Sequence, residues 1–259
     1  MRLTQLIYLL PALLLFSSCG KGTSTEEVRT AYTLAMKNQD YVTATQMIYL
    51  QLAIDTGNID LQDSLARLYY QRSAWPQTAA VGEKVLEARP NDTLTLKRVA
   101  EARQQLGQHE KALADFQRLY SMQKSANSLY QIAVLQYLTQ DKPAALITVN
   151  QLLNAPSVKE EGTIVTFNDR GRAQSQVVSV FAAALNLRGV LLLEAENAEE
   201  AEESFALALQ NAPNFVLAYN NLSQINQERA NSIVQQAQEQ ALQQQRLQQQ
   251  QGGQPQIGR

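Results

Sequence analysis

Histidine and cysteine, which supply many catalytic and metal-binding groups, occur once each in this sequence of 259 residues, at His109 and Cys19. Catalysis needs convergent titratable groups, and His109-Glu110 lacks the second histidine of a zinc-binding helix. The sequence also contains no G-x-S-x-G motif, no phosphate-binding loop and no dinucleotide fingerprint. It therefore predicts a protein that is not an enzyme, with no cofactor and no metal site, in which His109 packs at a turn.

An acidic run could in principle attract calcium, and it comprises Glu194, Glu196, Glu199, Glu200, Glu202 and Glu203. The run straddles a predicted turn in which Asn197 is a good helix N-cap. Glu199 and Glu200 then fall in the first turn of the next helix, where the macrodipole favours negative charge. A solvated helix start explains the run better than a calcium site does.

Cys19 lies directly after an apolar N-terminal segment. Arg2 supplies a short positive region, residues 6–16 are an apolar run too brief to span a bilayer, and two serines precede the cysteine. This arrangement resembles a bacterial lipoprotein signal, although the family usually has leucine where this chain has Phe16. The resemblance implies cleavage before Cys19, attachment of diacylglycerol and palmitate there and, because Gly20 follows, the outer membrane. An ordinary secretory peptide with an incidental cysteine is the alternative.

This resemblance divides the N-terminal region into a signal peptide, residues 1–18, and a flexible tether, residues 19–25. Over the whole chain, glycine (11) and proline (7) are scarce while alanine, leucine and glutamine abound, which favours helices over sheets. The hydrophobic content of 45% is enough for a core, and the formal net charge is −2. Basic residues are scattered, so no basic stripe indicates nucleic-acid binding.

From about residue 26 to residue 125 the chain repeats with a period of 34 residues. Small side chains recur at Ala44, Thr78 and Ala112. Ring-bearing side chains recur three positions earlier, at Tyr41, Trp75 and His109. A period of this length is typical of helix pairs stacked in an array, in which each pair buries its apolar face against the next.

The clearest repeat lies within residues 185–222. Its small, aromatic and proline residues are 12, 4, 3 and 5 positions apart: Gly189, Ala201, Phe205, Ala208 and Pro213. Two antiparallel helices pack closely only where small side chains meet, so Gly189 should face Ala201, with Phe205 filling the remaining space. This spacing resembles the tetratricopeptide repeat (TPR). The resemblance implies an all-α protein, an α-solenoid of about five TPR helix pairs plus a capping helix, over residues 26–230.

An extra segment, about residues 158–180, separates the fourth and fifth helix pairs. T-I-V-T-F and Q-V-V-S-V alternate and are rich in β-branched residues, and N-D-R-G between them places Gly171 where a turn needs positive φ. The segment is predicted to be a small β-hairpin inserted in the solenoid. The alternative is an early start of the next helix, at Gln174.

Residues 231–259 form a glutamine-rich tail that is expected to be helical at first and disordered at its end. Its apolar residues make a thin stripe without sustained heptads: Ile233, Val234, Ala237, Ala241, Leu242 and Leu247. A solvated tail explains this pattern better than a coiled-coil partner does, and both alternatives stay open.

In TPR proteins the first helix of each pair lines the concave side, and ligands contact its second, fifth, ninth and twelfth positions. Carried onto this sequence, the resemblance implies a lining that includes Arg29, Asp63, Arg67, Tyr70, Lys97, Glu101, Gln131, Asn186, Asn220 and Gln224. This lining is mixed in charge and rich in amides, which suits an extended peptide or a protein segment. The family's clamp for a C-terminal carboxylate is not expected, because Thr33 replaces its first asparagine and Asp63 adds the wrong charge.

The two resemblances together imply a lipid-anchored TPR scaffold or adaptor. It would face the periplasm at the outer membrane and bind a protein or peptide partner of the cell envelope. The alternative is a lipoprotein that binds peptidoglycan or another glycan. In that case the hairpin, residues 163–178, would act as a lid over a platform of Tyr70 and the amides.

Overall fold

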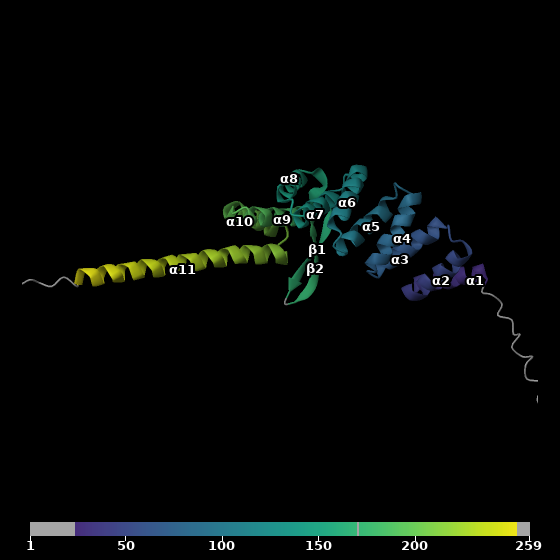
Figure 1. Ribbon diagram of the computed structural model, residues 1–259, viewed down its shortest axis with the longest axis horizontal. Helices are drawn as coiled ribbons and strands as arrows, with labels where there is room; N and C mark the ends of the chain where they lie inside the picture. Colours follow the sequence, from purple (N-terminus) through teal and green to yellow (C-terminus); the bar gives the residue numbers. More distant parts are fainter. Residues whose placement is uncertain (1–23, 170, 253–259) are drawn as a thin grey trace, which may run out of the picture. The chain divides into compact units, whose positions relative to one another are not determined.

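The computed structural model describes residues 24–169 and 171–252, in which helices dominate (Figure 1). The chain forms two compact units that divide between Pro90 and Asn91. The first unit contains α1 (Thr25–Lys37), α2 (Tyr41–Ile54), α3 (Ile59–Gln71) and α4 (Trp75–Ala88). The second contains α5 (Thr93–Gln105), α6 (His109–Gln123), α7 (Ala126–Leu138), α8 (Lys142–Leu153), a 3-10 turn (Pro156–Lys159), β1 (Gly162–Asp169), β2 (Arg172–Ser179), α9 (Val180–Glu194), α10 (Ala198–Asn211) and α11 (Val216–Gly252).

These elements confirm the predicted fold class. Five consecutive helix pairs, from α1/α2 to α9/α10, are followed by the single helix α11. The β-hairpin lies between the fourth and fifth pairs, as predicted, with β1 and β2 antiparallel in a continuous register. The alternative of a helix starting at Gln174 is wrong, because α9 begins only at Val180, after the N-cap Ser179.

A left-handed residue ends the first helix of every pair. These residues are Gln39, Ser73, Gly107, Gln140 and Glu196, with φ between 55° and 72°. The following N–H donates to a carbonyl five residues earlier, as in the 2.9 Å bond from Asp40 N to Ala35 O. This is the Schellman motif. In all five pairs the second helix starts directly after the residue whose N–H donates this bond. The constant turn explains why the repeat period is visible in the sequence.

The fourth residue of each second helix lies at the seam of its pair and is 0% exposed: Ala44, Thr78, Ala112, Ala145 and Ala201. The fifth pair shows why small residues are needed there. A Cβ atom added to Gly189 would lie 2.5 Å from Cε1 of Phe205, whose side chain is 0% exposed. The predicted packing of Phe205 against Gly189 is therefore confirmed.

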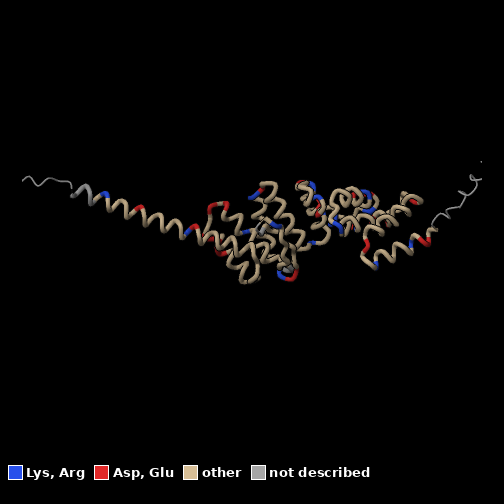
Figure 2. The backbone as a smooth tube through the Cα atoms, turned by 90° about the horizontal axis from the view of Figure 1, so that it is seen from below, with Lys and Arg blue, Asp and Glu red and all other residues tan. Residues whose placement is uncertain are grey.

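α11 changes character along its length. Ala218 and Ile225 are buried, and Ile225 packs with Leu192 and Phe205, so the start of α11 covers the last helix pair. From residue 226 to residue 247 every side chain is exposed. Acidic and basic residues are interspersed along the chain, and α11 carries few of them (Figure 2). Its charged residues are Glu228, Arg229, Glu239 and Arg246.

Several predictions concern the chain ends. Ser24 caps α1, and Thr25 is its first residue, so these two belong to the helix rather than to the predicted tether 19–25. The signal peptide, residues 1–18, and Cys19 lie outside the described residues, as does the end of the tail, residues 253–259. Among the residues that the structure describes, no helix has both the length and the apolar character that a bilayer span requires.

Candidate functional site

The predicted lining residues fall in both compact units. In the first unit, Arg29 and Arg67 are exposed on α1 and α3, and Asp63 is half-buried. The ring of Tyr70 meets that of Trp75 edge to face, with centroids 5.8 Å apart. Tyr70 therefore supports the start of α4 as well as contributing to the surface.

A shallow hollow of about 340 Å³ lies along α1. It is lined by side chains of this helix alone: Glu26, Arg29, Thr30, Thr33, Leu34 and Lys37. Ligand pockets usually gather side chains from several elements around an enclosed volume, so this hollow is an open part of the helix surface.

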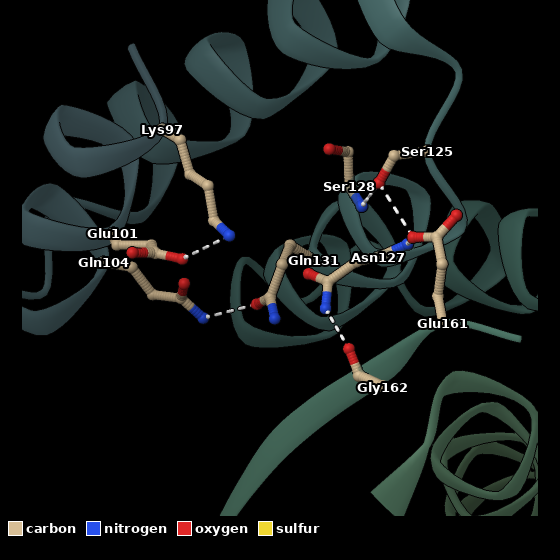
Figure 3. A network of polar contacts seen from close by, with 9 residues as sticks. All are labelled: Lys97, Glu101, Gln104, Ser125, Asn127, Ser128, Gln131, Glu161 and Gly162. Carbon is tan, nitrogen blue, oxygen red and sulfur yellow. Dashed lines mark hydrogen bonds and ion pairs between the residues drawn. The ribbon is translucent and has the colours of Figure 1, made fainter. Parts of the chain in front are cut away.

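In the second unit, polar side chains of α5 and α7 meet on the surface formed by the first helices (Figure 3). Lys97 Nζ lies 3.8 Å from Oε1 of Glu101, one turn along α5. Gln104 Nε2 donates a 3.2 Å hydrogen bond to Oε1 of Gln131 on α7. The structure thus brings together three of the predicted lining residues, with Gln104 as an additional member. We call Lys97, Glu101, Gln104, Asn127 and Gln131 the polar row.

The remaining predicted residues lie on α9 and α11. Asn186 is only 8% exposed, and its Oδ1 accepts a 3.0 Å bond from Nδ2 of Asn221. It was predicted as an open lining residue, but in the structure it joins α9 to α11 and is not accessible. Asn220 is exposed, and Gln224 donates to Glu228 one turn further along α11.

The base of the hairpin is fixed to α7 by Glu161. Its carboxylate accepts bonds from the backbone N–H groups of Ala126 and Asn127, at 2.9 and 2.8 Å, and from Oγ of Ser125 at 3.0 Å. These donors form the N-terminus of α7, where the helix dipole favours a negative charge. Asn127 Nδ2 also donates to Gly162 O at 2.8 Å, so α7 holds the first residue of β1 directly (Figure 3).

The middle of β2 contacts the start of α11 through Gln176. Its Nε2 donates to Asn214 O at 2.6 Å, and its Oε1 accepts from the N–H of Val216 at 3.1 Å. One face of the hairpin is also packed, because Val165 and Val178 are 9% and 7% exposed. The hairpin is therefore held at its base, along one face and at α11, and a lid motion would have to break these contacts.

The opposite face of the hairpin is open. Ile164 and Val177 stand directly across from each other in the register, and they are 65% and 75% exposed. Thr166 and Ser175 form the next pair on this face, with their hydroxyl oxygens 3.2 Å apart. An apolar pair beside a polar one gives this face a small amphipathic surface.

Three of the six glutamates in the acidic run form ion pairs with separate partners, and the run is not gathered around one point. The ion pairs are Glu194–Lys142, Glu200–Arg188 and Glu202–Arg229. Tyr137 donates to Glu194 at 2.7 Å, and this bond, together with Lys142, lowers the pKa of that carboxyl below its usual range. The same bond and burial raise the pKa of Tyr137 to about 12. Within residues 24–169 and 171–252, no three acidic, histidine or cysteine side chains are placed to share a metal ion.

His109 begins α6 at the predicted turn position and is half-buried. Glu161, Gln176 and Asn127 were not predicted as important residues. The side chain of each forms a hydrogen bond with a residue 34 to 40 positions away in the sequence. Such contacts leave no periodic or motif-like signal, in contrast to a local N-cap, and only the folded chain reveals them.

Solved structures with a similar fold are TPR proteins. The crystal structure of YrrB, described as a TPR protein with an unusual peptide-binding site, matches with a TM-score of 0.59 at 15% identity, over 77% of this chain and 92% of that one. MamA from Desulfovibrio magneticus RS-1 matches with a TM-score of 0.58 at 11% identity, over 74% and 96% of the two chains. The helix pairs therefore have the TPR fold. No protein-family model matches the chain, and no curated protein matches its sequence.

Proposed function

Starting from this TPR fold, we propose that the chain is a non-catalytic scaffold that binds a protein or peptide partner. The observation that carries the proposal is the polar row beside the fixed hairpin, where half-buried amides from α5 and α7 come together. Amide side chains both donate and accept hydrogen bonds, so they suit the peptide backbone. YrrB, which shares the fold, is described as having a peptide-binding site.

We further propose that Cys19 anchors the scaffold to the outer membrane, on its periplasmic side. The support is the sequence of the N-terminal region, in which an apolar run and two serines precede the cysteine. One acyl chain gives marginal membrane binding, and several chains on one cysteine give a stable anchor, at about 0.8 kcal/mol per buried CH₂. The six residues from Cys19 to Ser24 would span at most about 20 Å, so the first helix would lie close to the bilayer.

The alternative of a glycan-binding lipoprotein has less support. That function would use the hairpin, residues 163–178, as a lid, whereas Gln176 and the buried Val165 and Val178 hold the hairpin in place. It would also use Tyr70 as a platform, and the ring of Tyr70 packs against Trp75. We therefore keep the protein partner as the proposal.

Photo-crosslinking in the cell tests the binding function. A photoreactive amino acid replaces Gln131, which lies in the polar row, and in the control it replaces Gln117, which is exposed on the second helix α6. We expect one defined envelope protein to be crosslinked from position 131 and not from position 117. Equal crosslinking from the two positions, or none from position 131, would remove the polar row from the function.

Metabolic labelling with a lipid analogue tests the anchor separately. Wild-type protein should take up the label and fractionate with outer membranes. Cys19→Ala should lose the label and the membrane association. Label that persists in this variant would show that the cysteine is not the attachment site.

A further inference from the structure

The hairpin has two edges, and its hydrogen-bonding pattern shows which groups face outward. Val180 N–H donates to Glu161 O at 2.9 Å, so these residues form a hydrogen-bonded pair at the start of the ladder. Such pairs alternate along antiparallel strands. Thr163 and Val165 therefore bond to β2, while the N–H and C=O groups of Gly162, Ile164 and Thr166 point away from it.

The contact of Gly162 agrees with this assignment, because its carbonyl accepts the bond from Asn127 and lies on the side of α7. Further along the same edge, no hydrogen bond within the described residues reaches the outward backbone groups of Ile164 and Thr166. The edge also lacks the usual protection against strand pairing. Neither strand contains lysine or proline, and the register has no bulge.

The surroundings of this edge favour a particular occupant. Figure 3 shows Asn127 and Gln131 on the side of α7 from which β1 departs. A single added strand would have a second edge of its own. The donors and acceptors of the polar-row amides that remain beside the Gln104–Gln131 and Asn127–Gly162 bonds can supply hydrogen-bond partners for that edge. If the added strand were β1 of a second copy of this chain, its second edge would already be paired with β2 of that copy. Such a strand would have no use for the amides of the polar row.

From these observations, and resting on the proposed scaffold function, we propose that an extended segment of a partner protein pairs with the edge of β1 as a third strand. The segment is uncharged, because the amides of the polar row are neutral and Lys97 is paired with Glu101. It carries an apolar residue at every second position, because Ile164 offers 65% of its surface to a neighbour on the open face.

A proline scan of the two edges tests the proposal. Thr166→Pro removes an outward N–H from β1 and leaves the backbone hydrogen bonds of the hairpin intact, and both proline variants lose the hydroxyl contact between Thr166 and Ser175. Ser175→Pro is the matched control, because Ser175 is the register partner of Thr166 and its N–H points outward from β2. The probes are peptides selected from a random phage-displayed library on the purified wild-type protein and then synthesised.

We expect the selected peptides to show alternating apolar residues and few charges. Thr166→Pro should weaken their binding by at least about tenfold and Ser175→Pro by less than about twofold, and raising the salt concentration should change the affinity little. Residue-resolved hydrogen exchange provides a second measurement that does not depend on proline. Peptide binding should slow exchange at Ile164 and Thr166 and leave Ser175 and Val177 unchanged.

Several results would contradict the proposal. No selected peptide, unchanged exchange at Ile164 and Thr166, or equal binding by both proline variants would overturn the edge proposal. If wild-type protein is a dimer that Thr166→Pro converts to monomer while peptide binding persists, the edge binds a second copy and the proposal is wrong. Crosslinking of an envelope protein from position 131, combined with any of these results, would leave the scaffold function standing without the added strand.

Discussion

Replacing Gly189 by alanine should destabilise the fifth helix pair, although alanine is the better helix former. A Cβ atom at this position would lie 2.5 Å from Cε1 of Phe205 and 2.8 Å from Cδ1. Carbon atoms in contact normally lie about 3.5–4.0 Å apart, so the ring would have to move by about 1 Å. Phe205 is 0% exposed and packs with Leu192, Ala201 and Ile225, which leaves it little room.

Two effects of opposite sign set the size of the change in the free energy of unfolding. Alanine gains about 1 kcal/mol over glycine in a helix interior. Overpacking a close-packed core costs about 1–3 kcal/mol, and a clash with three ring carbons belongs at the upper end. We therefore expect Gly189→Ala to lower the free energy of unfolding by about 1–2 kcal/mol.

Urea denaturation followed by circular dichroism measures this loss, and hydrogen exchange of peptides from α9 and α10 locates it. Gly57→Ala, in the loop before α3, is the control for adding a methyl group without a clash, because an added Cβ there meets no atom within 4 Å. Adding Phe205→Leu to Gly189→Ala should recover part of the loss, with a coupling free energy of about 1 kcal/mol. A Gly189→Ala protein as stable as wild type, or a double-mutant cycle without coupling, would refute the packing argument.

Two further predictions concern the turns and one surface pair. Gln140→Gly should raise the free energy of unfolding by about 0.5–1 kcal/mol, because Gln140 has a φ of 65°, which glycine adopts without strain. Gly107→Ala should lower it by about 1 kcal/mol, because Gly107 has a φ of 72°. Urea denaturation measures both changes. Tyr137→Phe should destabilise the protein at neutral pH, because it removes the bond that lowers the pKa of Glu194. A carboxyl with a lowered folded pKa contributes stability above its ordinary value of 4.5 and loses it as the pH falls through the folded pKa, so thermal melts of variant and wild type should converge in acid.

The repeat architecture could be predicted because its causes are local and periodic. Ala44, Thr78 and Ala112 recur at the position where two helices touch, and all three are 0% exposed. The spacing from Gly189 to Phe205 identified a contact that the structure confirms in atomic detail. Alternation of β-branched residues likewise predicted the hairpin, since side chains in a strand point to opposite faces in turn.

The candidate site was predicted less completely, because its members depend on the partners that folding brings to them. Gln131 was predicted, but its bond to Gln104 was not. Asn186 occupies a lining position of the repeat, yet α11 covers it and Asn221 bonds to it. A position within a helix repeat specifies a direction around that helix, and it does not specify what another helix places in front of it.

The sequence by itself determined that helix pairs form, where they touch, and that a hairpin interrupts them, because these features follow from side-chain size and period within a few turns of chain. Only the tertiary structure decided where that hairpin is held and which of its edges remains unpaired. Glu161 meets the start of α7 across 34 to 36 residues, and Gln176 meets Asn214 and the start of α11 across 38 to 40. Hydrogen bonds over such separations exist only once packing has brought their partners together, so no local pattern can encode them.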